Sequence, residues 1–349
     1  MNTLKMANSN SRYAWADLIR VVAIYGVVLI HSCGEYFYQF EDISRSSWLQ
    51  SVLLDSIVRS AVPLFVMLSG ALILCKSEKC DDALMEVNHL PRRLTRILIP
   101  LLVWSGVYFW HLARNGVPVN VRSIFISPAM YHLWFAYMIV GIYFILPVIR
   151  PIFTAMTRSV RLSAYFFLIW FVVTSLPVYL PIPLLSLLMQ SSLFGYGGYF
   201  ILGAMIAQAN RIPFSTLSWL LVFFASIGVT VLVTWIFSKQ AGSPVETAFK
   251  YFSPNTVVAS VAAFVLLSRV SVSGRLVSWL HYCSDRTFFI YFVHVLTLEY
   301  VRFNPGFLGM TGDWPVGLKI VAISLLTFAI SLAIAALVNL IPRSRHVFG

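Results

Sequence analysis

Four ionisable residues lie inside the first long apolar run of the chain, which extends from Ala14 to Phe40. They are Asp17, Arg20, His31 and Glu35. Because a helix turns about 100° per residue, all four fall within a stripe about 60° wide, and His31 lies about 16 Å further along the axis than Arg20. Charged side chains at membrane depth are costly, so their alignment predicts that this face has a function.

His31 is the candidate catalytic residue of the stripe. A neutral imidazole can take a proton from a hydroxyl as a general base, or carry an acyl group itself as a nucleophile. Glu35, one helical turn further on, is placed to orient that imidazole or to stabilise its cation. The structural alternatives are a buried histidine bonded to a backbone carbonyl and a solvated glutamate at the end of a membrane span.

Asp17 and Arg20 are three residues apart and can therefore reach each other on a helix. An ion pair between them would make insertion into a membrane tolerable without any chemistry. A guanidinium facing an internal cavity would equally bind a phosphate or a developing anion. Both interpretations remain open, and we include both residues in the candidate catalytic set.

The composition defines the class of protein that carries this stripe. Of the 349 residues, 59% are hydrophobic and only 11% are charged, and the mean hydropathy is +0.82. A soluble domain of this size could not bury so much apolar surface, so we predict a polytopic membrane protein. The formal charge of +12 comes from Lys and Arg in short loops, which membrane orientation explains more simply than nucleic-acid binding does.

Apolar stretches of spanning length recur along the whole chain, which predicts an all-α, polytopic transmembrane helical bundle of about ten spans. They cover roughly residues 14–38, 52–75, 95–113, 130–150, 162–180, 190–209, 215–238, 252–270, 285–302 and 315–341. Lys and Arg are more frequent in the loops on the side of the N-terminus, Lys76 and Lys79 among them, so we expect both termini in the cytoplasm. We expect a cytoplasmic tail at 1–13, a transmembrane domain at 14–341 and a second cytoplasmic tail at 342–349, with the first span retained rather than cleaved as a leader.

The cysteines give no sign of a disulfide framework or a metal site. The chain has four, Cys33, Cys75, Cys80 and Cys283. Cys75 and Cys80 flank KSEK without a pair of histidines at metal-binding spacing, and the other two lie in predicted spans. We interpret all four as structural thiols and predict no metal.

Two further basic groups have alternative explanations. Arg92, Arg93 and Arg96 lie where a helix enters the membrane; they can anchor the span by charge, which charge alone favours, or clamp an anionic phosphate. Asp55 and Arg59 are four residues apart at the outer end of the predicted second span. They can form a simple salt bridge at the interface.

Three histidines from different predicted spans are expected at one depth. His132, followed by Trp134, enters the fourth span from the outer side, and His294 lies about ten residues into the ninth. Each histidine alone is more often structural than catalytic. Together with His31 they predict a polar cavity that opens outward.

Several segments resemble the acyltransferase-3 family of multi-spanning membrane acyltransferases. They are DLIRVVAIYGVVLIH at 17–31, VPLFVMLSG at 62–70, RRLTRILIP at 92–100, YHLWF at 131–135 and FFIYFVH at 288–294, in this order. The resemblance extends over residues 14 to 300. It is closest to the bacterial branch that O-acetylates surface polysaccharides such as enterobacterial common antigen.

The resemblance implies an acyl-CoA donor, usually acetyl-CoA, supplied from the cytoplasm. It also implies a glycan acceptor, such as a polysaccharide or lipopolysaccharide, on the outer side of the bacterial inner membrane or lipid-linked within that membrane. His31 matches the essential first-span histidine of the family, and Arg20 matches its paired arginine. Arg92, Arg93 and Arg96 match the basic motif near the CoA phosphates, and Arg59 matches a basic residue before VPLF. The segments with His132, Trp134, His294 and Tyr291, together with Asp55, are expected to bind substrate.

Two other classes of protein would also explain part of the sequence. A secondary transporter or flippase uses buried Arg, His and acidic residues, but we detect no inverted repeat and the charge is concentrated on the first span. A non-catalytic membrane subunit would explain the apolar bulk but not the aligned stripe. Loss of turnover with retained donor binding, after removal of the histidine, would separate an enzyme from a scaffold.

Overall fold

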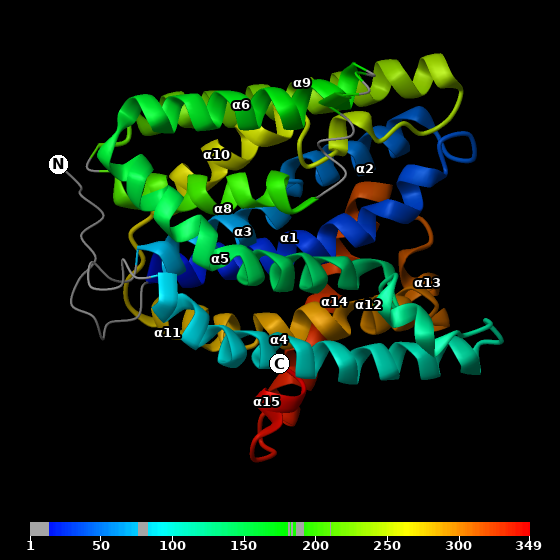
Figure 1. Ribbon diagram of the computed structural model, residues 1–349. Helices are drawn as coiled ribbons and strands as arrows, with labels where there is room; N and C mark the ends of the chain where they lie inside the picture. The colour runs from blue at the N-terminus through cyan, green and yellow to red at the C-terminus, as the bar shows by residue number, and fades with distance from the viewer. Residues whose placement is uncertain (1–13, 76–82, 181, 183, 186–191, 210) are drawn as a thin grey trace.

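The computed structural model describes residues 14–75, 83–180, 182, 184–185, 192–209 and 211–349. The predicted tail at 1–13, Lys76, Lys79 and Cys80 lie outside the described residues. Throughout the described part the regular structure is helical, and strands are absent from it. The predicted all-α bundle is therefore confirmed (Figure 1).

The helices follow the apolar stretches closely. Their bounds are α1 Ala14–Tyr38, α2 Arg45–Val58, α3 Ala61–Leu74, α4 Ala83–Arg114, α5 Trp134–Arg158, α6 Val160–Tyr179, α8 Ser192–Gln208, α9 Thr216–Ala241, α10 Pro254–Ser268, α11 Arg275–Ser284, α12 Thr287–Arg302, α13 Pro305–Thr311, α14 Val316–Val338 and α15 Ser344–Val347. Short 3₁₀ turns are η1 Val121–Phe125, η2 Tyr131–Leu133 and η3 Thr247–Phe249.

Eight segments of the described chain are long and apolar enough to cross a membrane. The predicted sixth and ninth stretches correspond to α8 and α12, which are shorter, with 17 and 16 residues. The predicted second stretch is α2 and α3 together, which form one segment, Arg45–Leu74, interrupted at Arg59 and Ser60. The chain is therefore a multi-pass membrane protein.

Helix α1 lies in the interior of the bundle. It packs against α2, α3, α10, α11, α12 and α14, and 72% of its most apolar segment is buried, against 17% for α6 and 22% for α9. Helices α6 and α9 lie at one edge of the bundle (Figure 1). Because neighbouring helices enclose α1, its ionisable side chains face protein rather than lipid.

Helices α3 and α8 cross at close range through two glycines. A Cβ atom on Gly70 would lie 1.8 Å from the carbonyl oxygen of Phe200, and one on Gly203 would lie 2.0 Å from that of Met67. Only glycine permits this approach, which is how transmembrane helices gain packing where the hydrophobic effect is weak. The crossing holds α3 against the core beside α1.

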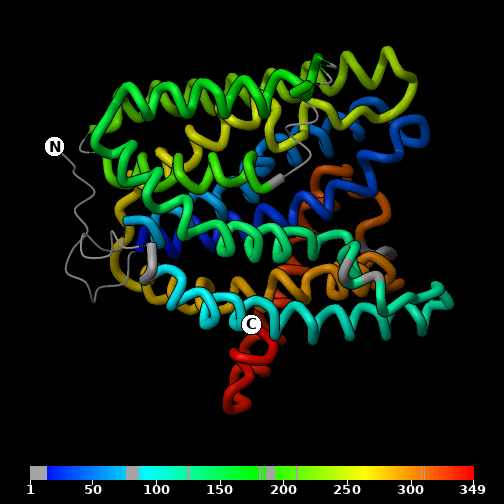
Figure 2. Tube along the Cα trace, in the orientation of Figure 1, coloured from blue at the N-terminus to red at the C-terminus, as the bar shows by residue number. Residues whose placement is uncertain are grey.

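Most of the long helices run along one common direction, which α14 crosses steeply, so the bundle has two ends (Figure 1). The last residues of α3, α5, α8 and α10 and the first residues of α4, α6, α9 and α11 lie at one end. We call it the basic end because Arg158, Arg161, Arg269 and Arg275 lie there. The connections α1–α2, α4–α5, α9–α10 and α12–α13 lie at the opposite end (Figure 2). Arg20 is nearer the basic end of α1, and His31 is nearer the opposite end.

Candidate functional site

One cavity of about 330 Å³ connects the two halves of the stripe on α1. Arg20 and Arg96 line it toward the basic end, and His31 and His132 line it toward the opposite end. Apolar side chains form the wall between these two groups: Val27, Ile30, Val62, Phe65, Ile97, Phe135, Ala136 and Ile139. The cavity therefore offers a path from a cationic pair to a pair of imidazoles.

His31 presents a ring without a polar partner. Its imidazole stacks on that of His294 with ring centroids 5.3 Å apart, and lies edge-on to Tyr131 at 5.1 Å. Within the described part of the chain the ring makes no hydrogen bond. Its backbone oxygen, in contrast, accepts a 2.6 Å bond from Nη2 of Arg302. The backbone at this position is fixed while the imidazole remains available to a ligand.

His294 lies directly behind His31 and is fully buried. Its Nδ1 lies 2.7 Å from the carbonyl oxygen of Tyr291 and 3.2 Å from that of Ile290. A carbonyl oxygen can only accept, so Nδ1 carries the hydrogen and the Nε2 of the neutral ring holds a lone pair. This Nε2 has no hydrogen-bond partner among the described residues.

His132 completes the group of three histidines that the sequence predicted at one depth. Its ring is 4.9 Å from that of His294, and neither of its nitrogens has a partner among the described residues. Buried polar atoms are normally hydrogen-bonded, so three such nitrogens beside one cavity mark a place suited to a polar ligand. The clustering of the three imidazoles is thus a feature of the structure as well as of the sequence.

Glu35 contacts Arg302 instead of the imidazole one turn before it. The carboxylate lies 3.2 Å from Nε of Arg302, and its side chain is 44% exposed. Arg302, at the end of α12, thereby joins Glu35 to the backbone of His31 and Ser32. The local sequence around Arg302 gives no sign of this role.

Arg20 is held by a buried network rather than by Asp17 alone. Its Nη1 donates to Oδ1 of Asp17 at 3.0 Å and lies 3.3 Å from Oγ of Ser284. The Ser284 hydroxyl also donates to Asp17 at 2.5 Å, and Nδ1 of His281 donates to its other oxygen. Asp17 is fully buried, whereas the Arg20 side chain is 33% exposed and lines the cavity. The ion pair and the cavity-facing guanidinium, which the sequence left as alternatives, occur together.

The three arginines of α4 occupy three different environments. Arg96 lines the cavity, Arg92 is exposed, and Arg93 forms an ion pair with buried Glu86. Glu86 also binds Arg150 of α5 at 2.5 Å. Glu86 and Arg93 are seven positions apart and so share a helix face, and this spacing is the sequence signal for their pair.

Arg150 is a structural residue of the interior, although it resembles a loop charge in the sequence. Its side chain is only 5% exposed. Besides Glu86 it donates to the carbonyl oxygens of Ile73 at 2.8 Å and Leu74 at 3.3 Å. These are unpaired carbonyls at the end of α3, so Arg150 caps that helix and links it to α4 and α5.

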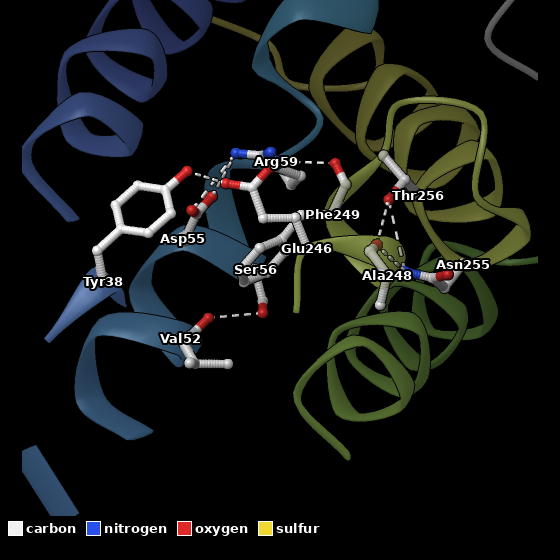
Figure 3. A network of polar contacts seen from close by, with 10 residues as sticks. All are labelled: Tyr38, Val52, Asp55, Ser56, Arg59, Glu246, Ala248, Phe249, Asn255 and Thr256. Atoms are coloured by element: carbon white, nitrogen blue, oxygen red, sulfur yellow. Dashed lines mark hydrogen bonds and ion pairs between the residues drawn. The ribbon is translucent and has the colours of Figure 1, made fainter. Parts of the chain in front are cut away.

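Asp55 and Arg59 lie near the middle of the Arg45–Leu74 segment, because α2 begins earlier than predicted. This corrects their expected place at the outer end of the span. Their salt bridge measures 3.1 Å, and Nε of Arg59 donates to the carbonyl oxygen of Phe249 at 2.7 Å. Figure 3 shows Glu246, which accepts from Tyr38, beside this pair.

Aromatic residues form much of the wall around the imidazoles. Trp134, Tyr251 and Tyr291 line the cavity, and the rings of Trp134 and Tyr251 are 5.9 Å apart. The Tyr291 hydroxyl donates to the carbonyl oxygen of His132 at 2.9 Å and accepts from the Ala136 amide at 3.2 Å. Tyr291 thus presents its ring to the cavity while its hydroxyl fixes α5 against α12.

No three His, Cys, Asp or Glu side chains of the described residues gather in a way that could hold a metal ion. Cys33, Cys75 and Cys283 are free thiols. Burial raises the pKa of the Cys75 thiol to about 12, so this group stays protonated at neutral pH.

The fold and the cavity define a multi-pass membrane protein with imidazoles and a guanidinium on one internal path. Comparison with known proteins adds the chemistry: the acyltransferase domain model of the acyltransferase-3 family matches residues 13–336. The chain belongs to this family and is a membrane acyltransferase. Neither the curated proteins nor the solved structures yield a match.

Proposed function

We propose that the chain is an O-acyltransferase that moves an acyl group, acetyl in the simplest case, from acyl-CoA to a glycan hydroxyl. The acceptor would be a surface polysaccharide, of the enterobacterial common antigen or lipopolysaccharide type, or its lipid-linked precursor. The observation that carries the proposal is one continuous cavity lined by Arg20 and Arg96 at one end and by His31 and His132 at the other. Membership of an acyltransferase family supports the same chemistry.

The donor would enter from the basic end. A nucleotide diphosphate cannot cross lipid with its charges unpaired, so it needs cations at the entrance. Arg20 and Arg96 line the cavity there, and exposed Arg92 adds positive charge nearby. The pantetheine arm would then follow the apolar wall toward His31. This arrangement requires the basic end to face the cytoplasm of a bacterial inner membrane, with the domain at 14–341 between cytoplasmic tails.

The acceptor hydroxyl would reach His31 from the opposite end. In direct transfer, His31 takes the hydroxyl proton while the oxygen attacks the thioester carbonyl, and the departing CoA thiolate recovers that proton. In the two-step alternative, the imidazole attacks the thioester and its ring proton goes to the thiolate. The hydroxyl oxygen then displaces the acyl group and returns a proton to the ring.

Side chains around the imidazoles would bind the acceptor. Trp134, Tyr291 and His132 line the cavity, and aromatic rings together with unpaired ring nitrogens suit a sugar with apolar faces and hydroxyl groups. Asp55 and Arg59 form a salt bridge with each other. We therefore propose that they support the cavity wall and do not contact the donor.

The test is acyl transfer by the purified protein in lipid, with radiolabelled acetyl-CoA and a range of glycan acceptors. Native protein should release CoA and label a glycan, and His31→Ala should do neither while still binding donor. His346→Ala, which changes an exposed histidine of α15, is the matched control and should behave as native. Label retained on the protein without acceptor would favour the two-step route. Native protein that neither binds nor consumes acetyl-CoA would overturn the proposal.

A further inference from the structure

Helix α11 places two polar side chains beside the carboxylate that holds Arg20. Asp17 receives hydrogen bonds from Arg20, Ser284 and His281, and the last two residues are more than 260 positions away in the sequence. Apolar contacts of Val21 with Leu280 and Cys283 fix α11 against the same turn of α1. Two independent kinds of contact therefore join α11 to α1 where Arg20 meets the cavity.

The buried charge of Asp17 requires the hydrogen bonds that Ser284 and His281 donate. Asp17 is fully buried, and a buried carboxylate is destabilising unless donors satisfy its oxygens. Ser284 binds both Asp17 and Arg20, so it also fixes their relative position. With His281 on the second oxygen, the carboxylate cannot rotate without breaking a bond.

The cluster is continuous with the wall of the cavity. Thr287 lines the cavity and donates to the carbonyl oxygen of Ser284 at 2.9 Å. Arg20 lines it as well, from the other helix. A shift of α11 relative to α1 would therefore move both the Arg20 guanidinium and the Thr287 hydroxyl in the cavity wall.

We propose that His281 and Ser284 are positioning residues for acyl transfer, acting through Asp17 to hold the Arg20 guanidinium at the donor end of the cavity. This inference rests on the proposed function, because it takes Arg20 as a contact of the acyl-CoA phosphates or pantetheine arm. Neither residue touches substrate. Their effect is on the binding of donor, whereas that of His31 is on the chemical step.

The experiment compares single variants of the full-length protein in lipid nanodiscs, with acetyl-CoA as the donor probe. His281→Ala should raise the KM for acetyl-CoA about tenfold, as expected for loss of a charge-assisted hydrogen bond, and change kcat less than about threefold. His281→Gln, whose amide can still donate to Asp17, should recover most of the loss. Ser284→Ala should raise KM about threefold, and His346→Ala should leave it unchanged.

A double-variant cycle separates positioning from general loss of structure. If His281 acts through Arg20, then His281→Ala should add no further loss of acetyl-CoA affinity in an Arg20→Ala background. Additive losses, an unchanged KM in His281→Ala, or a fall in kcat that follows loss of folded protein would each overturn the inference. If His31→Ala abolishes transfer while His281→Ala behaves as native, the inference fails and the proposed function stands. Native protein inert toward acetyl-CoA would overturn both.

Discussion

The polar groups at the two ends of the cavity differ in whether they are hydrogen-bonded. At the basic end Arg20 is bound into a network in which Asp17 receives hydrogen bonds from Arg20, His281 and Ser284 of the described chain. At the opposite end both nitrogens of His132 and Nε2 of His294 lack hydrogen-bond partners within the described chain, and the described contacts of the His31 ring are with the rings of His294 and Tyr131. The basic end holds the charged guanidinium of Arg20 in place, whereas imidazole nitrogens at the opposite end are left without hydrogen-bond partners.

This difference corresponds to two tasks. A guanidinium is always protonated and is useful only when its position is fixed, so partners that hold it do not weaken its function. An imidazole acts by exchanging a proton, and a partner on its reactive nitrogen would compete with the substrate. The contrast predicts that variants at the opposite end change turnover and that variants at the basic end change donor affinity.

The largest effect should come from His31→Ala. In the proposed mechanism His31 takes the acceptor proton, so its removal should lower kcat about 10³-fold, because no hydrogen-bonded partner substitutes for it. The Kd for acetyl-CoA should stay within about twofold, since Arg20 and Arg96 remain. Steady-state kinetics and equilibrium binding measure the two quantities, and a parallel loss of binding would break the comparison.

Arg20→Lys should have the next largest effect. A lysine keeps the charge but lacks the planar guanidinium, which binds Asp17 and lines the cavity at the same time. The KM for acetyl-CoA should therefore rise about thirtyfold. Arg161→Ala removes an exposed arginine of the basic end and is the control. Equal responses of the two variants would mean that only the total positive charge matters.

Arg302→Gln tests how far the backbone of His31 depends on support from α12. The substitution removes the charge that binds the carbonyl oxygen of His31 at 2.6 Å and pairs with Glu35. We expect kcat to fall about tenfold, with the KM for donor unchanged. A change confined to donor KM would contradict the assignment of Arg302 to the opposite end.

Glu35→Gln should have the smallest effect, within about threefold on kcat. Its ion pair with Arg302 is partly solvated, with 44% of the glutamate side chain exposed, and such pairs contribute little. The same assays measure it. A loss close to that of His31→Ala would return Glu35 to the role of orienting the imidazole that its spacing first indicated.

Helical spacing on α1 predicted that four ionisable side chains share one face, and two of them, Arg20 and His31, line the cavity, whereas Asp17 binds Arg20 and Glu35 binds Arg302. The 100° rule put Arg20 and His31 on one face, and both line one cavity. The predicted span 14–38 coincides with α1. Periodicity works here because a single buried helix carries the stripe and its faces are fixed by local geometry alone.

The partners of these residues could not be predicted in the same way. His281 reaches Asp17 and Arg302 reaches His31 only because α11 and α12 pack beside α1, and no local pattern encodes such contacts. Arg150 resembled a loop charge because nothing near it in the sequence revealed Glu86. Pairings over long sequence separation depend on tertiary packing.

Helix α12 is too short to cross a bilayer by itself. It has 16 residues, which span about 24 Å at 1.5 Å per residue, against about 30 Å for the hydrocarbon core of a bilayer. Its ends are flanked by Arg286 and Arg302. Apart from Tyr300 its side chains are buried or partly buried, so protein rather than lipid surrounds it. The polar ends of α12 therefore lie within a bundle of longer helices, where Arg302 binds the backbone of His31.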